Sequence, residues 1–219
     1  MSFEVEKQKF LTMPLEEKRK YYKGSVITLD QIPTWVEYWT KNKGNIGIMN
    51  LEKVEKVEEE MAKKISIWQG DITSLEIDAI VNAANSSLLG GEIRIDKAYY
   101  SQSCWTKFKE RVKNNWGLYV AYVIHTVGPQ GEKPEKLKEC YENSLTVARA
   151  NELRTIAFPC ISTGIYGYPQ RPAAKVALST VKKFLLDNKD SVDRVIFCLF
   201  LKTDKDIYEE LLQKYFAID

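Results

Sequence analysis

Residues 80–91 read IVNAANSSLLGG, and residues 158–169 read FPCISTGIYGYP. Each stretch begins with an apolar run typical of a buried strand and continues into a loop of small, hydroxyl-bearing or amide-bearing residues. Two such loops at the ends of neighbouring strands can form a cleft that wraps a nucleotide diphosphate. These stretches therefore predict both the kind of fold and the place of a binding site.

Strand-like and helix-like runs alternate from residue 65 to the end of the chain. The strand-like runs are residues 65–68, 79–82, 119–127, 155–160 and 192–201, and the helix-like runs are residues 134–151, 172–188 and 204–215, the last capped by Asp204. This order predicts an α/β fold with a mixed, mostly parallel central sheet sandwiched by helices. In such sheets ligands bind at the carboxyl ends of the strands.

The first 64 residues differ from the rest, and we expect a helical extension with a charged linker ahead of a main domain at residues 65–219. Residues 14–20 predict a short helix, because proline stands in its first turn and acids precede bases. Residues 27–39 are apolar and aromatic, so we expect them to pack on the main domain. Residues 51–64 alternate Glu and Lys, which indicates a solvated helix face.

The composition fits one domain with an added terminal piece. The chain has 219 residues, and its net charge of +2 gives no general attraction for nucleic acids or membranes. The four cysteines, Cys104, Cys140, Cys160 and Cys198, have no close metal-ligand spacing. We therefore expect no disulfide, no metal and a reducing location, in the cytoplasm or the nucleus. We find no run that could span a bilayer and no signal-peptide core.

The loop at residues 162–168 has the composition of a phosphate-binding loop. Gly164 and Gly167 let backbone amides approach a ligand closely, and Ser162 and Thr163 add hydroxyl donors. The helix that follows favours an anion at its start. A plain strand-to-helix turn, in which glycine and serine are also common, is the alternative.

Polar side chains follow two other predicted strands. Asn82 and Asn85 offer donors and acceptors that suit sugar hydroxyls, although either could instead satisfy loop backbone. Asp71 could accept a hydrogen bond from an exocyclic amine or could cap the turn after it. For Asp71 taken alone we favour the cap.

Four motifs together resemble the signatures of macrodomains, in particular the MacroD type of ADP-ribosyl hydrolase. They are GDIT at residues 70–73, IVNAANSSLLGG at 80–91, VIHTVGP at 123–129 and FPCISTGIYGYP at 158–169. The resemblance extends to residues 15–20 and 30–35, and to residues 192–200 near the end of the chain. It implies a macrodomain that binds ADP-ribose without a cofactor, removes mono-ADP-ribose from acidic protein side chains and deacetylates O-acetyl-ADP-ribose.

The resemblance also implies roles for individual residues. Asp71 would accept from the adenine amine, the Ile72 amide would meet the ring, and Phe200 would lie against it. The loop from Ser162 to Tyr166 would wrap the diphosphate. The full expected ADP-ribose site is Asp71, Ile72, Asn82, Gly90, Gly91, Ser162, Thr163, Gly164, Ile165, Tyr166 and Phe200, with Asn85 and Asp96 as catalytic residues.

Residues 92–121 depart from the MacroD pattern. Members of that type continue with more glycine and then a Val-Asp-Gly run over the phosphates. With one inserted residue, Asp96 stands for the aspartate implicated in hydrolysis, and Tyr100 replaces a histidine. Glu92 would repel a diphosphate, while Arg94 could pair with it.

The same segment carries the one basic and aromatic cluster of the chain. Its members are Lys97, Trp105, Lys107, Phe108, Lys109, Arg111, Lys113 and Trp116. Such a mixture can bind single-stranded nucleic acid. We favour instead an amphipathic helix with Trp105, Phe108 and Val112 packed inward, and expect no nucleic-acid partner.

His125 is the single histidine, and it lies within an apolar strand-like run. A structural role is therefore expected, which leaves acid–base work to Asp96 or to a phosphate of the substrate.

Three functions stay open at this point. The first is a hydrolase acting, as a monomer, on mono-ADP-ribosylated proteins. The second is a module that reads ADP-ribose without cleaving it, since the glycine-rich loop is altered. The third is a domain whose altered segment closes the cleft. Turnover of a mono-ADP-ribosylated protein separates the first two.

Overall fold

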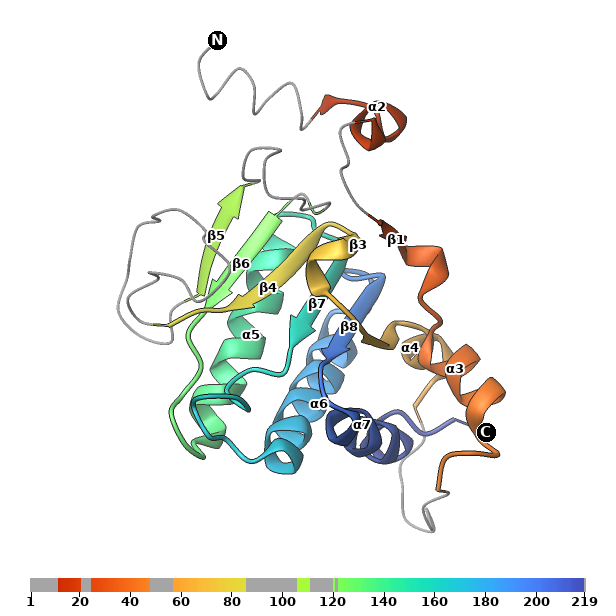
Figure 1. The fold of residues 1–219 in the computed structure, drawn as a ribbon, viewed down its shortest axis with the longest axis vertical. Coiled ribbons are helices and arrows are strands. Elements are labelled where there is room, and N and C mark those ends of the chain that lie inside the picture. Colours follow the sequence, from red (N-terminus) through yellow and green to blue (C-terminus); the bar gives the residue numbers. More distant parts are fainter. Residues whose placement is uncertain are drawn as a thin grey trace.

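A six-stranded sheet forms the centre of the molecule in the computed structural model, which describes residues 12–20, 25–47, 57–85, 106–110 (backbone only), 120 and 122–218. In spatial order the strands are β2 (Ile65–Gln69), β8 (Arg194–Leu199), β7 (Thr155–Pro159), β4 (Ala79–Ala83), β6 (Tyr122–Thr126) and β5 (Thr106–Glu110). Neighbours run parallel except β5, which pairs antiparallel with β6 at the edge of the sheet (Figure 1). The predicted mixed, mostly parallel α/β sheet is therefore confirmed.

Helices α5 (Pro134–Ala150), α6 (Gln170–Asp187) and α7 (Lys202–Tyr215) flank one face of the sheet. Alternate residues of β2, β4, β6, β7 and β8, such as Val81 and Phe197, point into this larger core because side chains of a strand alternate between faces. The neighbours Ile80 and Ile196 face a second, smaller core, whose other members include Ile32, Leu75 and Ile77. That second core lies against the short helices η1 (Leu29–Gln31) and η2 (Ile72–Ser74) and the pair β1 (Ile27–Thr28) and β3 (Leu75–Glu76).

The edge strand β5 corrects one prediction. Residues 106–110 were expected within an amphipathic helix, but they form a strand in which Phe108 pairs with Ile124. In TKFKE the two lysines flank Phe108 with period two, and the same five residues also fit a helix, so the local pattern alone does not decide between the two structures. The backbone edge of β6 offers hydrogen bonds that only a strand satisfies.

The start of α7 corrects a second prediction. Asp204 was expected to cap this helix, but the helix begins two residues earlier, at Lys202, and Leu201 takes the cap position. Asp204 still performs a capping function from the third helical position, because its carboxylate accepts a hydrogen bond from the Leu201 amide at 3.0 Å. Helix α6 likewise begins at Gln170 rather than at residue 172.

Residues of the N-terminal region pack on the main domain, as expected for residues 27–39. Helix α3 (Trp35–Asn42) begins at a capping box, in which Thr34 and Glu37 satisfy each other's backbone amides. Trp35 is only 1% exposed, and its indole donates to the Phe216 carbonyl at 3.2 Å. Helix α2 (Leu15–Arg19) joins the main domain through paired hydrogen bonds from Arg19 to the Glu76 carboxylate. Helix α4 (Glu59–Lys63) precedes β2, and the proposed boundary at residue 64 stays a prediction.

Replacing Trp35 by alanine is expected to destabilise the whole domain by about 3–5 kcal/mol, because it removes a large buried ring and leaves a cavity. Trp35→Phe keeps most of the packing but leaves the Phe216 carbonyl without its hydrogen-bond donor, so we expect the free energy of unfolding to fall by only about 1–3 kcal/mol. Urea unfolding followed by circular dichroism measures both. An alanine variant as stable as the parent would mean that α3 lies outside the cooperative unit.

None of the helices in the described ranges is long and apolar enough to cross a membrane. The cysteines that the structure describes, Cys140, Cys160 and Cys198, are free thiols.

Candidate functional site

The carboxyl ends of five parallel strands meet at one edge of the sheet. In spatial order they lead into residues 70–72 after β2, 200–201 after β8, 160–168 after β7, 84–85 after β4 and 127–133 after β6. Hydrogen bonds link neighbouring segments: Gln69 Nε2 donates to the Phe200 carbonyl at 3.3 Å, and the Gly131 amide donates to the Tyr166 carbonyl at 2.7 Å. Strands β4 and β7, which lead into the two loops predicted to form a cleft, pair in parallel, so their carboxyl ends are adjacent, while residues 86–91 of the first loop lie outside the described residues.

The loop at residues 162–168 has a left-handed backbone conformation at two of its positions. Ser162 has a positive φ of 67°, and Gly167 has one of 66°. Two internal bonds close the loop, from the Tyr168 amide to the Ser162 carbonyl at 3.0 Å and from the Gly167 amide to the Gly164 carbonyl at 2.9 Å. A left-handed φ at a residue other than glycine costs free energy and tends to occur at functional sites.

Three consecutive amides of this loop have no acceptor within the described part of the chain. The backbone N–H groups of Gly164, Ile165 and Tyr166 take part in no intramolecular hydrogen bond there. Successive free amides form an anion-binding nest, and the following helix α6 adds the positive end of its dipole. This arrangement favours phosphate binding over a plain turn.

The hydroxyl groups of Ser162 and Thr163 in this loop are directed into the protein rather than toward a ligand. Thr163 Oγ1 donates to the Cys160 carbonyl at 3.1 Å, which fixes the first turn of the loop. The Ser162 hydroxyl is buried against the β6 end, where no hydrogen-bond partner meets it among the described residues. The donors that this conformation offers a ligand are therefore backbone amides rather than side-chain hydroxyls.

Asp71 and Phe200 lie at the other end of the edge, after the adjacent strands β2 and β8. Asp71 caps η2: its Oδ1 accepts from the Thr73 amide at 2.9 Å and from the Thr73 hydroxyl at 2.7 Å. Both bonds end on Oδ1, and the residue is exposed, so Oδ2 is accessible to a donor from a ligand. Phe200 is 84% exposed. An exposed phenyl ring and an exposed carboxylate together suit an aromatic base that carries an amine.

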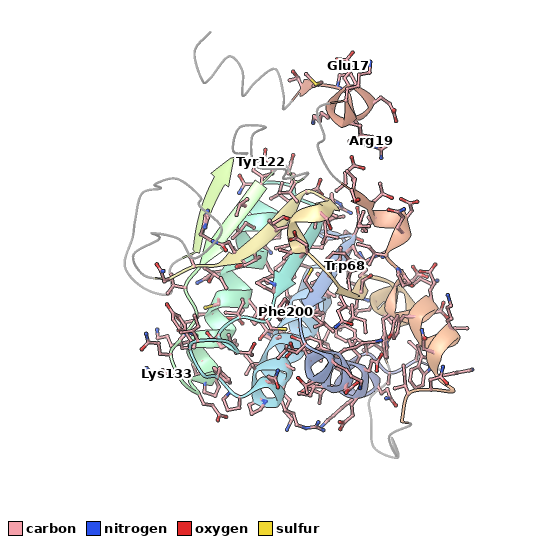
Figure 2. All side chains as sticks on the ribbon, viewed as in Figure 1. Glu17, Arg19, Trp68, Tyr122, Lys133 and Phe200 are labelled. Atoms are coloured by element: carbon pink, nitrogen blue, oxygen red, sulfur yellow. The ribbon has the colours of Figure 1, made fainter. Side chains whose placement is uncertain are left out.

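Trp68 covers the backbone between these two groups. A Cβ added to Gly70 would lie 2.5 Å from the Trp68 ring, so glycine is required while the indole stays in place. Trp68 lies in β2, and Phe200 directly follows the neighbouring strand β8 (Figure 2). A side chain at position 70, next to Asp71, would therefore displace the indole.

Asn82 is held by the single histidine. Its Nδ2 lies 3.1 Å from His125 Nδ1 on the adjacent strand β6, and His125 is 5% exposed. The expected structural role of His125 agrees with this pairing. Asn85 lies exposed at the end of the segment after β4. Gly90, Gly91 and Asp96, expected at the site, lie outside the described residues.

A model of the macro domain family matches residues 81–177 of the chain. ADP-ribose glycohydrolase MACROD1 of Rattus norvegicus is 39% identical over 93% of this chain and 84% of its own length. This chain belongs to the macro domain family. The resemblance to the MacroD type is thereby confirmed.

Other relatives of this macrodomain extend the comparison. ADP-ribose glycohydrolase MACROD2 of Homo sapiens is 41% identical over 98% of this chain, but the chain spans only 54% of that relative, about half of its length. Among solved structures, a Trypanosoma brucei macrodomain in complex with ADP-ribose has a TM-score of 0.67 at 28% identity. The match covers 92% of this chain and 88% of the Trypanosoma brucei chain.

Sequence reasoning missed Gly128, at which two loops of this macrodomain approach closely. A Cβ there would lie 2.1 Å from Ser162 Oγ and 2.7 Å from Ile161 Cγ2. Gly128 therefore lets the segment after β6 pack against the start of the loop at residues 162–168, which we call the phosphate loop after its expected ligand. The glycine in VIHTVGP was the available signal in the sequence, but it does not show that Ile161 and Ser162 are the residues that Gly128 approaches.

Cys160 stands at the entrance of the phosphate loop, where its surroundings disfavour the thiolate that a nucleophile needs. Burial above all, and then the charge of Asp204, raise the pKa of the Cys160 thiol to about 12. A thiol reacts as thiolate, and with this pKa only roughly one molecule in ten thousand carries one at about pH 8. We expect iodoacetamide at that pH to leave Cys160 unmodified in the folded protein and to alkylate it in urea. Peptide mass spectrometry reads both, and equal alkylation in the two states would contradict the burial.

Proposed function

We propose that this macrodomain binds ADP-ribose and hydrolyses the bond between ADP-ribose and an acidic protein side chain. The observation that carries the proposal is the row of three free amides at Gly164, Ile165 and Tyr166. It lies on the same sheet edge as the exposed Phe200 ring and the Asp71 carboxylate. Relatives named as ADP-ribose glycohydrolases, and a related structure in complex with ADP-ribose, support the choice of ligand.

The bound molecule would extend along the edge of the sheet. Its adenine would rest against Phe200, with the amine donating to Asp71 Oδ2 and the ring near the Ile72 amide. Its diphosphate would accept hydrogen bonds from the loop amides, which have no intramolecular acceptor among the described residues to give up. The distal ribose would then reach the Asn85 end.

Hydrolysis needs water to be positioned at the distal ribose. We propose Asn85 and Asp96 for this role on the resemblance alone, since Asp96 lies outside the described residues. Positioning effects of this kind can contribute several orders of magnitude to a rate. The same site would remove the acetyl group of O-acetyl-ADP-ribose. We further propose that the protein is a monomer. We also propose that it is located in the cytoplasm or nucleus, and the free thiols at Cys140, Cys160 and Cys198 agree with such a reducing compartment.

Calorimetric titration with ADP-ribose tests binding, and release of ADP-ribose from a protein mono-ADP-ribosylated on glutamate tests hydrolysis. Binding with turnover supports the proposal in full. Binding without turnover would make the chain a module that reads ADP-ribose. A folded protein that binds nothing would show that the segment at residues 92–121 closes the cleft.

A further inference from the structure

Asp204 is a buried carboxylate that does more than cap a helix. It is 4% exposed, in the first turn of α7. Its Oδ2 accepts from the Leu201 amide at 3.0 Å, and its Oδ1 accepts from Gln170 Nε2 at 2.9 Å. Burying a carboxylate is unfavourable unless it is well hydrogen-bonded, and a helix cap alone would use one oxygen at the surface. The second bond therefore indicates a further role.

The two partners lie in or next to two segments of the sheet edge, here called the Phe200 wall (residues 200–201) and the phosphate loop (residues 162–168). Leu201 directly follows Phe200, the exposed ring at the end of β8. Gln170 is the first residue of α6 and stands two residues after Tyr168, which closes the phosphate loop. Gln170 Nε2 also lies 3.2 Å from Thr203 Oγ1, so the start of α6 is joined to the start of α7 twice.

Asp204 also reaches the entrance of the phosphate loop through Cys160. The Cys160 thiol donates to the Cys198 carbonyl at 3.8 Å, and the charge of the nearby Asp204 contributes to its raised pKa. The Cys160 carbonyl accepts from the amide and the hydroxyl of Thr163, at 3.4 and 3.1 Å, and so holds the first turn of the loop. One carboxylate thus bonds to the exit of the phosphate loop and to the segment that carries Phe200, and its charge acts on the thiol at the entrance of the loop.

We propose that Asp204 is a positioning residue that fixes the phosphate loop relative to the Phe200 wall. The inference rests on the proposed function, because it assigns the two walls to the diphosphate and the adenine of one ligand. A ligand that spans both walls depends on their spacing, whereas a ligand that meets one wall does not. Asp204 itself touches no ligand.

Two variants break the Asp204 junction, by which we mean the hydrogen bonds of Asp204 to Leu201 and Gln170. Asp204→Asn keeps the shape but offers one acceptor oxygen, so either Leu201 or Gln170 loses its bond. Gln170→Ala leaves the Leu201 bond intact and removes only the link to α6, which keeps the test valid if the first variant folds poorly. Asp206→Asn is the matched control, since Asp206 lies on the same helix and pairs with Lys202 at the surface.

Calorimetry with ADP-ribose and with adenosine gives the first readout. For both junction variants we expect the Kd of ADP-ribose to rise about tenfold or more and that of adenosine to change less than about twofold, while the control changes neither. Equal weakening of the two ligands, or no weakening of either, would overturn the proposal, because a general loss of structure does not distinguish them.

Hydrogen exchange of the ligand-free protein gives the second readout. In Asp204→Asn we expect faster exchange at Leu201 and also at Thr163 and Tyr168, whose amides close the phosphate loop. Faster exchange at Leu201 alone would reduce Asp204 to a helix cap and refute the proposal. If the parent protein does not bind ADP-ribose, the proposed function fails, and this exchange pattern alone decides the role of Asp204.

Discussion

Replacing Gly164 by valine is expected to abolish tight ADP-ribose binding without changing the stability of the fold. Gly164 has no positive φ, and a Cβ there meets nothing within 4 Å, so the free protein has room for the new side chain. The valine methyl groups would, however, occupy the space above the free amides of Gly164 and Ile165, where the diphosphate must approach. Hydrogen bonds to a charged group contribute about 1.5–3 kcal/mol each, so losing two raises the Kd roughly 100-fold or more.

Gly44→Val is the matched control for this change. Gly44 follows α3 and is exposed, and a Cβ added there likewise meets nothing within 4 Å, but the residue lies outside the strand-end loops. We expect this variant to bind ADP-ribose as the parent does. Calorimetry and thermal unfolding on both variants decide the matter: if Gly164→Val binds normally, the diphosphate does not use these amides.

The parallel strands could be predicted because each is buried on both faces. Residues 79–82 and 155–160 are continuous apolar runs that end at asparagine, proline or cysteine followed by small residues, and β4 and β7 match them within one residue. The order of strand and helix then places their carboxyl ends on one edge. The edge at which the candidate site lies could therefore be predicted from the sequence.

The chemistry of the phosphate loop could be predicted only in part. Sequence shows side chains, so the hydroxyls of Ser162 and Thr163 were obvious donors. Which backbone amides remain free depends on the φ of Ser162 and Gly167, and Ser162 itself fits closely against Gly128. Gly128 and Ser162 are 34 positions apart, so their contact produces no pattern in the local sequence.

The roles of Asp204 and of residues 106–110 have the same origin. A carboxylate near a helix start indicates a cap, but its second partner, Gln170, comes from another helix. A five-residue run that fits two periods is decided by its neighbour β6, not by its own residues. In both cases tertiary contacts select among local alternatives.

Asp71→Ala is expected to raise the Kd of ADP-ribose about 10-fold to 100-fold, because a hydrogen bond from the adenine amine to a carboxylate contributes roughly 1.5–3 kcal/mol. The change also removes the cap of η2, which costs about 1 kcal/mol of local stability. Affinity alone therefore does not separate the two roles of Asp71. Discrimination between bases does, because hypoxanthine presents an acceptor oxygen where adenine presents its amine.

The parent protein should prefer ADP-ribose over its inosine counterpart by about tenfold or more, and Asp71→Ala should lose most of that preference. Thr73→Val is the control: it removes the 2.7 Å bond from the Thr73 hydroxyl to Oδ1 but keeps the carboxylate and the amide bond that caps η2. That variant should retain the preference. A preference that survives in Asp71→Ala would leave Asp71 as a cap only, and the adenine would have to be read by the backbone at Ile72 and the ring of Phe200.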